Sequence, residues 1–339
     1  YGEFGATAAL TGDATHRALL NDVLDPARRK LSWFAVHFPS YARWLYSRIG
    51  VVGRLVMSFL PMQKPATYSG IREHALQAFR NFRTSTQNGS FVASSSNSIL
   101  DRLWIHHKSQ KNGELDDMAI ASECADHFLA GIDTTSDSLM FLVWALSLSE
   151  NARFQDRLTE EVCGLPQHYL NQDGIPLVEA CDGLIFLDAI IKGTLRLYAP
   201  LPATEPRSLP IPSNIDSFDI PAGVIVGMSP YSLHRTPEVF KDPLTFNPCR
   251  WLDSPEEDLN KMKKWWWAFS SGGRMCIGIH LAMAEMTTLT AAIYRTFRTT
   301  VAPGFEGASP GITSRFEVFY DERFSLINVC NFIYLSNFN

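Results

Sequence analysis

The sequence predicts a mainly α-helical fold with a small β region. Apolar residues recur every three or four positions along 115–149 and again from Cys276 to about Thr296, which is the helical period. Between these stretches, residues 200–250 are rich in proline and carry short β-branched runs such as "GVIVGM", which predict small strands and turns. With 339 residues and 46% hydrophobic content, the chain has ample material for a globular core.

Composition narrows the function classes. The net charge of −5 gives no reason to expect nucleic-acid binding. The six cysteines are scattered with no CxxC pair, which favours neither a zinc site nor a disulfide framework and suits a reducing compartment. No run of about 18 apolar residues occurs, so no membrane-spanning segment is predicted. The sequence starts at Tyr1 without a signal pattern, so we expect a fragment or a processed product.

The region before residue 100 predicts mostly helices. The stretch 25–50 is basic, aromatic and amphipathic, and two interpretations are open. It forms a helix pair that packs on the core, or it covers a substrate cavity or touches a membrane surface. The polar segment "SFVASSSNS" at 90–98 predicts a mobile loop.

Three helices are predicted in the middle of the chain. The first, over 115–149, is far longer than the average of about 11–12 residues, which is typical of a helix crossing a large helical domain. A second follows over 152–162, and a third over about 184–199 ends at Pro200. In the third helix, Gly193 is predicted on the polar side, one turn before Arg196. The tail, 301–339, reads as loop and short strand.

The stretch with the strongest chemical signal is "FSSGGRMCIGIHLAMAEM" at 269–286. Its glycines allow a tight turn and close approach to a flat object. Cys276 lies just before a predicted helix N-terminus, where the dipole and free amides stabilise a thiolate. Arg274 is suited to an anionic group. A lone cysteine is more commonly a buried free thiol, but this one belongs to a pattern of five fixed positions, F-x-x-G-x-R-x-C-x-G, over 269–278.

This stretch resembles the haem-binding loop of the cytochrome P450 superfamily, the haem-thiolate monooxygenases. The resemblance implies that Cys276 is the axial ligand of the haem b iron, whose thiolate favours O–O cleavage. It implies that Phe269 packs beside the sulfur and that Arg274 contacts a haem propionate. Gly272 and Gly278 would let the backbone approach the porphyrin.

A second match lies in the long helix, where "AGIDTT" spans 130–135. Glycine and paired threonines are poor helix formers, so they predict a local distortion or side-chain bonding to the backbone. The resemblance implies that Asp133 and Thr134 deliver protons to bound dioxygen, and that Ala130 and Gly131 leave room for it. Taken alone, the pattern fits a helix-packing groove with a surface aspartate.

Weaker matches lie in "HRTPEVFKDP" at 234–243 and "FNPCRW" at 246–251, where Arg250 matches the arginine of the family. Arg207 in "TEPRSLP" stands where an arginine commonly meets a propionate. Position alone suggests His127, Ala203 and Thr204 as substrate-facing residues.

The resemblance covers essentially the whole chain. Segments such as "ATEPRSLP" and "PGITSRFEVFYDERF" resemble fungal microsomal members of the family that act in secondary metabolism. It implies one domain over 1–339 that lacks the N-terminal anchor, the first strands and the B/C-helix region. It further implies oxidation of a small apolar metabolite with O2, with electrons supplied by NADPH–cytochrome P450 reductase. A full-length member would lie on the cytosolic face of the endoplasmic reticulum membrane.

Two positions depart from the pattern of the family. The helix over 184–199 carries Gly-Thr-Leu-Arg where the family has Glu-x-x-Arg, so Arg196 and Arg250 would face each other without a carboxylate between them. The end, "SLINVCNFIYLSNFN", is also unlike the charged strand of the family. Because of these departures, an alternative function stays open: the chain is a P450-derived pseudoenzyme, or a non-redox protein that binds or isomerises a metabolite. A third alternative is an unrelated thiol enzyme. It would need a histidine close to Cys276, and His280 is a weak candidate for it.

Overall fold

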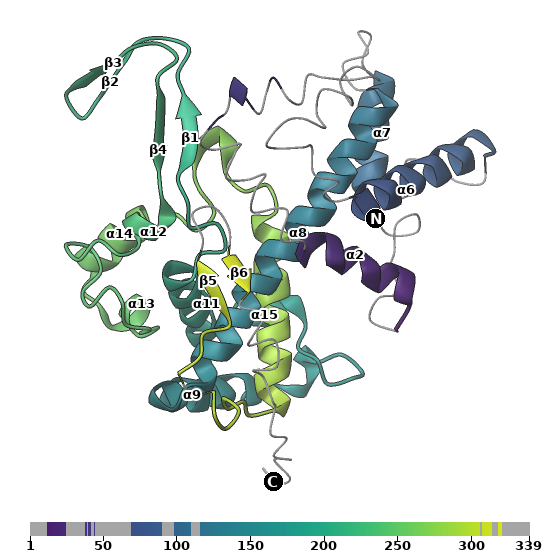
Figure 1. The fold of residues 1–339 in the computed structure, drawn as a ribbon. Coiled ribbons are helices and arrows are strands. Elements are labelled where there is room, and N and C mark those ends of the chain that lie inside the picture. Colours follow the sequence, from purple (N-terminus) through teal and green to yellow (C-terminus); the bar gives the residue numbers. More distant parts are fainter. Residues whose placement is uncertain are drawn as a thin grey trace. The chain divides into compact units, whose positions relative to one another are not determined.

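The structure is a computed structural model that describes residues 12–24, 38, 40–41, 44, 69–89, 98–109, 116–305, 307–313 and 318–320. It confirms a mainly α-helical chain with small antiparallel sheets (Figure 1). The chain forms two compact units, Tyr1–Asp133 and Thr134–Asn339. That these units make one domain stays a prediction, and each is described by itself.

The first unit is a small helical cluster. It contains helices α2 (Ala14–Leu24), α6 (Ser69–Gln87), α7 (Ile99–Ser109) and the first half of α8 (Asp117–Ser147). Its core holds buried apolar residues from all four, among them Leu19, Ile71, Phe79, Phe82, Leu100, Trp104 and Ile120. The segment 90–97 and nearly all of 25–50 lie outside the described residues, so the loop and the two interpretations of the amphipathic stretch stay predictions.

Helix α8 confirms the long helix expected over 115–149. It is continuous through 130–135, so the distortion expected at the glycine and threonines is absent from this helix. Side-chain bonding to the backbone does occur one turn later, where the Ser138 hydroxyl donates to the Thr134 carbonyl oxygen at 2.8 Å.

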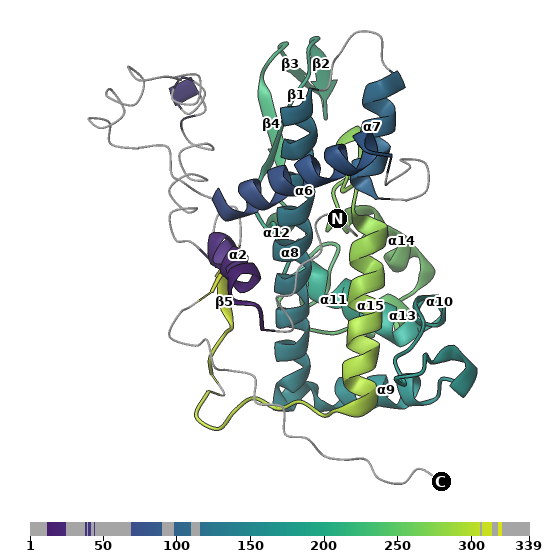
Figure 2. The ribbon, with the colours of Figure 1, turned by 90° about the vertical axis from the view of Figure 1, so that its right-hand side faces the viewer.

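The second unit is built around the C-terminal half of α8 and four further helices. These are α9 (Ala152–Cys163), α10 (Val178–Cys181), α11 (Ile185–Leu197) and α15 (Ile279–Thr296). Figure 2 shows α15 alongside the half of α8 that follows Thr134. The shared core includes Leu142, Leu146, Leu158, Leu187, Ile191, Met286 and Tyr294. The helices expected over 152–162 and 184–199, and the one after Cys276, are confirmed.

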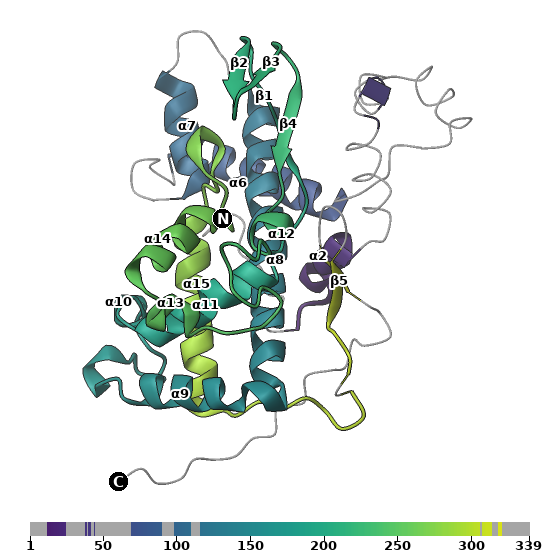
Figure 3. The same cartoon turned by 90° about the vertical axis from the view of Figure 1, so that its left-hand side faces the viewer.

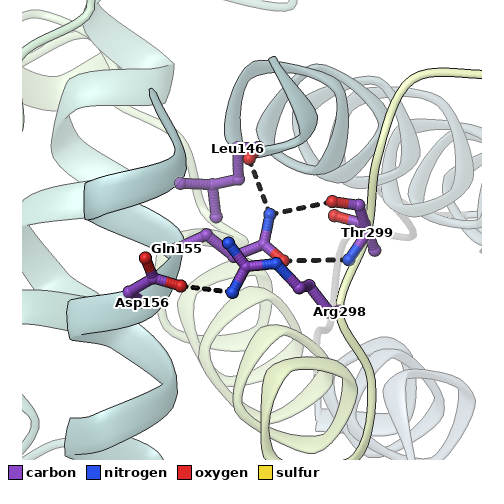
Figure 4. A network of polar contacts seen from close by, with 5 residues as sticks. All are labelled: Leu146, Gln155, Asp156, Arg298 and Thr299. Atoms are coloured by element: carbon purple, nitrogen blue, oxygen red, sulfur yellow. Dashed lines mark hydrogen bonds and ion pairs between the residues drawn. The ribbon is translucent and has the colours of Figure 1, made fainter. Parts of the chain in front are cut away.

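Gln155 fixes the end of this helical core. Its side-chain amide donates to the Leu146 carbonyl at 2.7 Å and to the Thr299 carbonyl at 3.0 Å, while its oxygen accepts from the Thr299 amide at 2.9 Å. An ion pair between Asp156 and Arg298 lies beside it (Figure 4). The side chain therefore joins α8, α9 and the segment after α15.

The β region consists of two-stranded antiparallel pieces. Strand β1 (Glu205–Ser208) pairs with β4 (Ile225–Met228), and β2 (Ser213–Ile215) pairs with β3 (Phe218–Ile220), which continue from one another in Figure 3. Asp216 and Ser217 both have positive φ, at 49° and 69°, as a tight two-residue hairpin turn requires. Strands β5 (Gly311–Thr313) and β6 (Val318–Tyr320) form a third pair.

Short helical segments complete the second unit. They are η1 (Ser149–Asn151), η2 (Gln167–Tyr169), α12 (Pro230–Leu233), α13 (Arg250–Asp253), α14 (Glu256–Trp265) and η3 (Gly272–Arg274). The unusual C-terminal sequence after residue 320 lies outside the described residues.

Candidate functional site

A closed loop between α14 and α15 presents Cys276. The Cys276 amide donates to the Phe269 carbonyl at 2.9 Å, and the Met275 amide donates to the Gly272 carbonyl at 3.1 Å. Gly272 has a φ of 73°, which favours glycine. These bonds close the loop on itself, two residues before α15 is capped by Gly278.

The Cys276 thiol is exposed at this loop and is not in a disulfide. It lies just before the N-terminus of α15, which begins at Ile279. A Cβ added at Gly278 would lie 4.0 Å from the Cys276 sulfur, an ordinary contact distance, so Gly278 lies next to the thiol.

The base of the loop is anchored in the core, whereas its tip is open. Phe269 is half-buried against the core and lies edge-to-face with Trp266, at 5.9 Å between ring centroids. Arg274 is exposed, and its guanidinium has no hydrogen-bond or ion-pair partner among the described residues. The loop therefore offers a thiol and a guanidinium on one rigid base.

The "AGIDTT" segment lies in the middle of α8. Ala130 and Gly131 are exposed, and no atom lies within 4 Å of a Cβ built on Gly131. Asp133 and Thr134 are half-buried. The next residue, Thr135, is buried and hydrogen-bonds the carboxyl of Glu285 in α15, whose pKa is raised by burial and lowered in part by that hydroxyl.

Arg196 and Arg250 form a buried cationic cluster behind the loop. Arg196 is 0% exposed and donates from Nη1 to the carbonyls of His234 and Pro243 and from Nη2 to that of Thr245. Arg250 is 7% exposed and donates to the carbonyls of Lys241, Asp242 and Thr245. Neither forms an ion pair with a carboxylate that the structure describes.

Gly193, one turn before Arg196 in α11, is buried, so its expected place on the polar side of the helix is wrong. Its Cα faces Phe246 and Pro248, and a Cβ would meet them at 3.7 Å and 3.6 Å, ordinary contact distances. The helical period of α11 alone could not show this, because the covering residues come from a segment about fifty positions later in the chain.

His234 is a residue for which the sequence predicted no role. It is 0% exposed; its Nδ1 lies 3.0 Å from the Arg196 carbonyl oxygen, and its Nε2 accepts from the Trp267 amide at 2.8 Å. Burial lowers its pKa to about 3, despite the bond to Arg196. A neutral ring with its proton on Nδ1 therefore ties α11 to the start of the Cys276 loop. The only signal in the sequence was its place in "HRTPEVFKDP".

The remaining candidate residues are more dispersed. Arg207 on β1 pairs with Glu205 at 2.9 Å, so its charge is already matched. Thr204 is exposed and lies against β4, because a Cβ on Gly227 would come within 2.3 Å of its methyl group, and Ala203 is half-buried beside it. His127 is half-buried in the first unit, with Nδ1 2.8 Å from the Glu123 carbonyl oxygen. His280 is exposed and makes no hydrogen bond to Cys276, which disfavours the Cys–His pair.

The residues of the loop fit haem. Cys276 offers an exposed sulfur before a helix N-terminus, and Gly278 places no side chain next to it. Arg274 offers an exposed guanidinium suited to a propionate. Among described residues, no group of three or more metal-ligating side chains occurs, so a metal at this loop would have Cys276 as its protein ligand. A haem iron suits such a site, because the porphyrin supplies most of its ligands and the protein needs to supply few.

Comparison with known proteins gives the family. The family model described as Cytochrome P450 matches residues 58–313, which include both the α8 segment and the Cys276 loop. This chain belongs to the cytochrome P450 family. No helix of the described part is long and apolar enough to cross a membrane.

Curated P450 relatives come from fungi. Cytochrome P450 monooxygenase aflV of Aspergillus parasiticus is 30% identical over 292 residues, covering 84% of this chain and 54% of the relative. Cytochrome P450 monooxygenase tazI of Aspergillus terreus is 37% identical over 197 residues, 58% of this chain and 38% of the relative. Cytochrome P450 monooxygenase stcB of Emericella nidulans is 34% identical over 192 residues, which cover 56% of this chain and 35% of the relative. The chain thus spans about half or less of the length of the relatives it matches.

Proposed function

We propose that this P450 is a haem-thiolate monooxygenase that oxidises a small apolar secondary metabolite. The observation that carries the proposal is the Cys276 loop: an exposed thiol before a helix N-terminus, held on a closed and half-buried base, inside the matched region. The relatives named above are monooxygenases, which supports the reaction class.

In this proposal the loop residues hold haem b. Cys276 would hold the haem iron through its sulfur, and Phe269 would pack beside that sulfur while fixing the loop to the core. Arg274 takes a propionate, and Arg207 is the candidate for the second, in competition with Glu205. Haem bound through a thiolate supplies the activation of dioxygen, because the sulfur donates electron density to the iron.

Residues of α8 have two roles in this proposal: they transfer protons, and they leave room for dioxygen. The carboxyl of Asp133 and the hydroxyl of Thr134 would hold water and supply a proton from solvent to the haem site, which is a task for a positioned acid and alcohol. Gly131 keeps its surroundings free of side-chain bulk, and Ala130 adds little. We assign His127, Ala203 and Thr204 to the substrate side; their role is to exclude water and select an apolar ligand.

The redox partner and location follow from the same proposal. NADPH–cytochrome P450 reductase supplies the electrons and O2 is the cosubstrate. The full-length protein lies on the cytosolic face of the endoplasmic reticulum membrane.

Haem titration of the full chain tests the ligand assignment. The unmodified chain and Cys163→Ala, which removes another exposed cysteine, are expected to take up haem with thiolate-type absorption. Cys276→Ala is expected to lose that absorption. If Cys276→Ala keeps it, Cys276 is not the ligand. NADPH consumption with reductase, screened against apolar metabolites, then tests turnover, and Thr134→Ala is expected to uncouple it.

One observation favours a second candidate, a P450-derived protein without redox turnover. The buried Arg196 and Arg250 have no described carboxylate partner, and such a cluster weakens the fold behind the Cys276 loop. In that case the chain would bind metabolites but take up little haem. Failure of haem uptake by the unmodified chain, together with recovery in Gly193→Glu, would favour this candidate.

A further inference from the structure

The cationic cluster at α11 contains two buried donors without acceptors. The Nε atoms of Arg196 and Arg250 are both buried and have no hydrogen-bond partner, although every other guanidinium nitrogen of the two residues donates to a main-chain carbonyl. Leaving a buried donor of a charged group unsatisfied is costly, more so than for a neutral one. These two N–H groups therefore call for an acceptor that the described side chains do not provide.

The charge around Arg196 is also one-sided. Burial is the main cause that lowers the pKa of Arg196, to about 9, followed by the charges of Arg250 and Arg235. Tyr198 stays neutral because burial raises its pKa to about 12, and the His234 pKa of about 3 leaves that ring uncharged. Carbonyl oxygens thus accept from both cations, and no carboxylate of the described residues contacts Arg196.

Among the described carboxylates, Asp242 is the one whose charge shifts the pKa of an arginine of this cluster. It raises the pKa of Arg250, yet its side chain is exposed and forms no ion pair with that guanidinium; Arg250 contacts its main-chain carbonyl instead, at 3.3 Å. It therefore leaves both Nε–H groups unmatched.

Gly193 leaves side-chain space on the same face of the helix. It precedes Arg196 by three positions, the spacing that puts two residues on one face. A Cβ built there would have no neighbour closer than Pro248 Cα, at 3.6 Å. As a glycine, this position places no side chain on the face of α11 that carries Arg196.

We propose that a small monoanion, of the size of chloride or formate, binds to the Nε–H groups of Arg196 and Arg250 beside Gly193. Two neighbouring guanidinium groups, each more than nine-tenths buried and each with an unsatisfied Nε–H, suit a small anion, because it supplies both an acceptor and the missing negative charge. Its occupancy stabilises α11 and, through His234, the start of the Cys276 loop. The proposal does not depend on haem or on turnover.

Thermal unfolding of the full chain tests the site. Gluconate is replaced stepwise by formate, and separately by chloride, at constant ionic strength. We expect a saturable rise in Tm of about 2 °C or more for the unmodified chain, as for any ligand that binds the folded state. Gly193→Ala adds only a methyl group with ordinary contacts, so it should keep this rise.

Gly193→Glu brings a carboxylate into the same space and should lose the anion-dependent rise while melting higher without the anion. If that variant does not fold, Gly193→Gln, which fills the space without charge, should also lose the rise. Broadening of the chloride NMR line by the unmodified chain, absent in Gly193→Glu, would show the binding directly. Equal anion dependence in all the variants, or equal line widths, would overturn the proposal.

Discussion

Arg196 and Arg250 donate to the same acceptor, the main-chain carbonyl oxygen of Thr245, at 2.9 Å and 3.4 Å. Two buried cations thus share a neutral dipole where an ion pair would balance them. The shared oxygen joins α11 to the segment before α13, and both lie next to the His234 contact with the Cys276 loop. We therefore expect the stability of the cluster and haem binding at the loop to be coupled.

Gly193→Glu is expected to stabilise the protein. A carboxylate at this position can accept from the free Nε–H groups of Arg196 and Arg250. Because removing one partner from a buried ion network costs about 3–5 kcal/mol, we expect the free energy of unfolding to rise by roughly 2–4 kcal/mol. Urea denaturation followed by circular dichroism measures it, and haem retention should rise as well.

The matched control for this change is Gly193→Ala. It gains only the helix propensity of alanine over glycine, about 1 kcal/mol, since its Cβ meets no neighbour closer than 3.6 Å. Equal stability of the Ala and Glu variants would show that the charge is irrelevant and that the arginines need no carboxylate.

His234 is expected to make the fold sensitive to mild acid. Its pKa is lowered to about 3, chiefly by burial, against an ordinary value of 6.5. The stability that depends on the neutral ring is present above pH 6.5 and is lost as the pH falls toward 3, because the unfolded state binds the proton first. Between about pH 6 and 4.5 the loss should be about 2 kcal/mol.

His234→Gln should flatten this pH dependence. Glutamine does not titrate, so the slope of unfolding free energy against pH should fall by close to one proton, while stability at neutral pH drops because the two fixed hydrogen bonds are weakened. His280→Gln removes an exposed histidine and should leave the slope unchanged. An unchanged slope in His234→Gln would contradict a neutral buried ring.

Glu161 is expected to stabilise the start of α11. Its carboxylate accepts from the amides of Phe186 and Leu187, each at 2.8 Å, which satisfies two free amides of the first turn. Glu161→Ala should lower the free energy of unfolding by about 1–2 kcal/mol. The neighbouring Glu160 is exposed, and Glu160→Ala should have little effect. Similar losses in both variants would argue against the cap.

The long helices could be predicted from sequence because their signals are local. Apolar spacing predicted α8 and α15, and Pro200 predicted the end of α11 near Leu197. The burial of Gly193 and His234 could not be predicted in this way, since His234 meets Arg196 and Trp267 over 38 and 33 positions of chain. Helix α14 was missed although its acidic first turn and basic last turn were visible.

The candidate site was predictable only in part, for the same reason. The order of loop residues around Cys276 could be read directly, and the structure gives that loop a closed base and an exposed thiol. The substrate-facing residues had only position to support them. Arg207 shows how weak a prediction from position alone is. It was predicted to contact a haem propionate, whereas its guanidinium donates to Glu205, only two residues away.

The central claim is that Cys276 holds haem iron as a thiolate, and the spectrum of the reduced, carbon monoxide-bound protein tests it most directly. The full chain loaded with haem, and the Cys163→Ala variant alike, should show the Soret band of a thiolate-ligated haem. Cys276→Ser should lack that band. A thiolate-type band in Cys276→Ser, or its absence from haem-loaded unmodified protein, would contradict the claim.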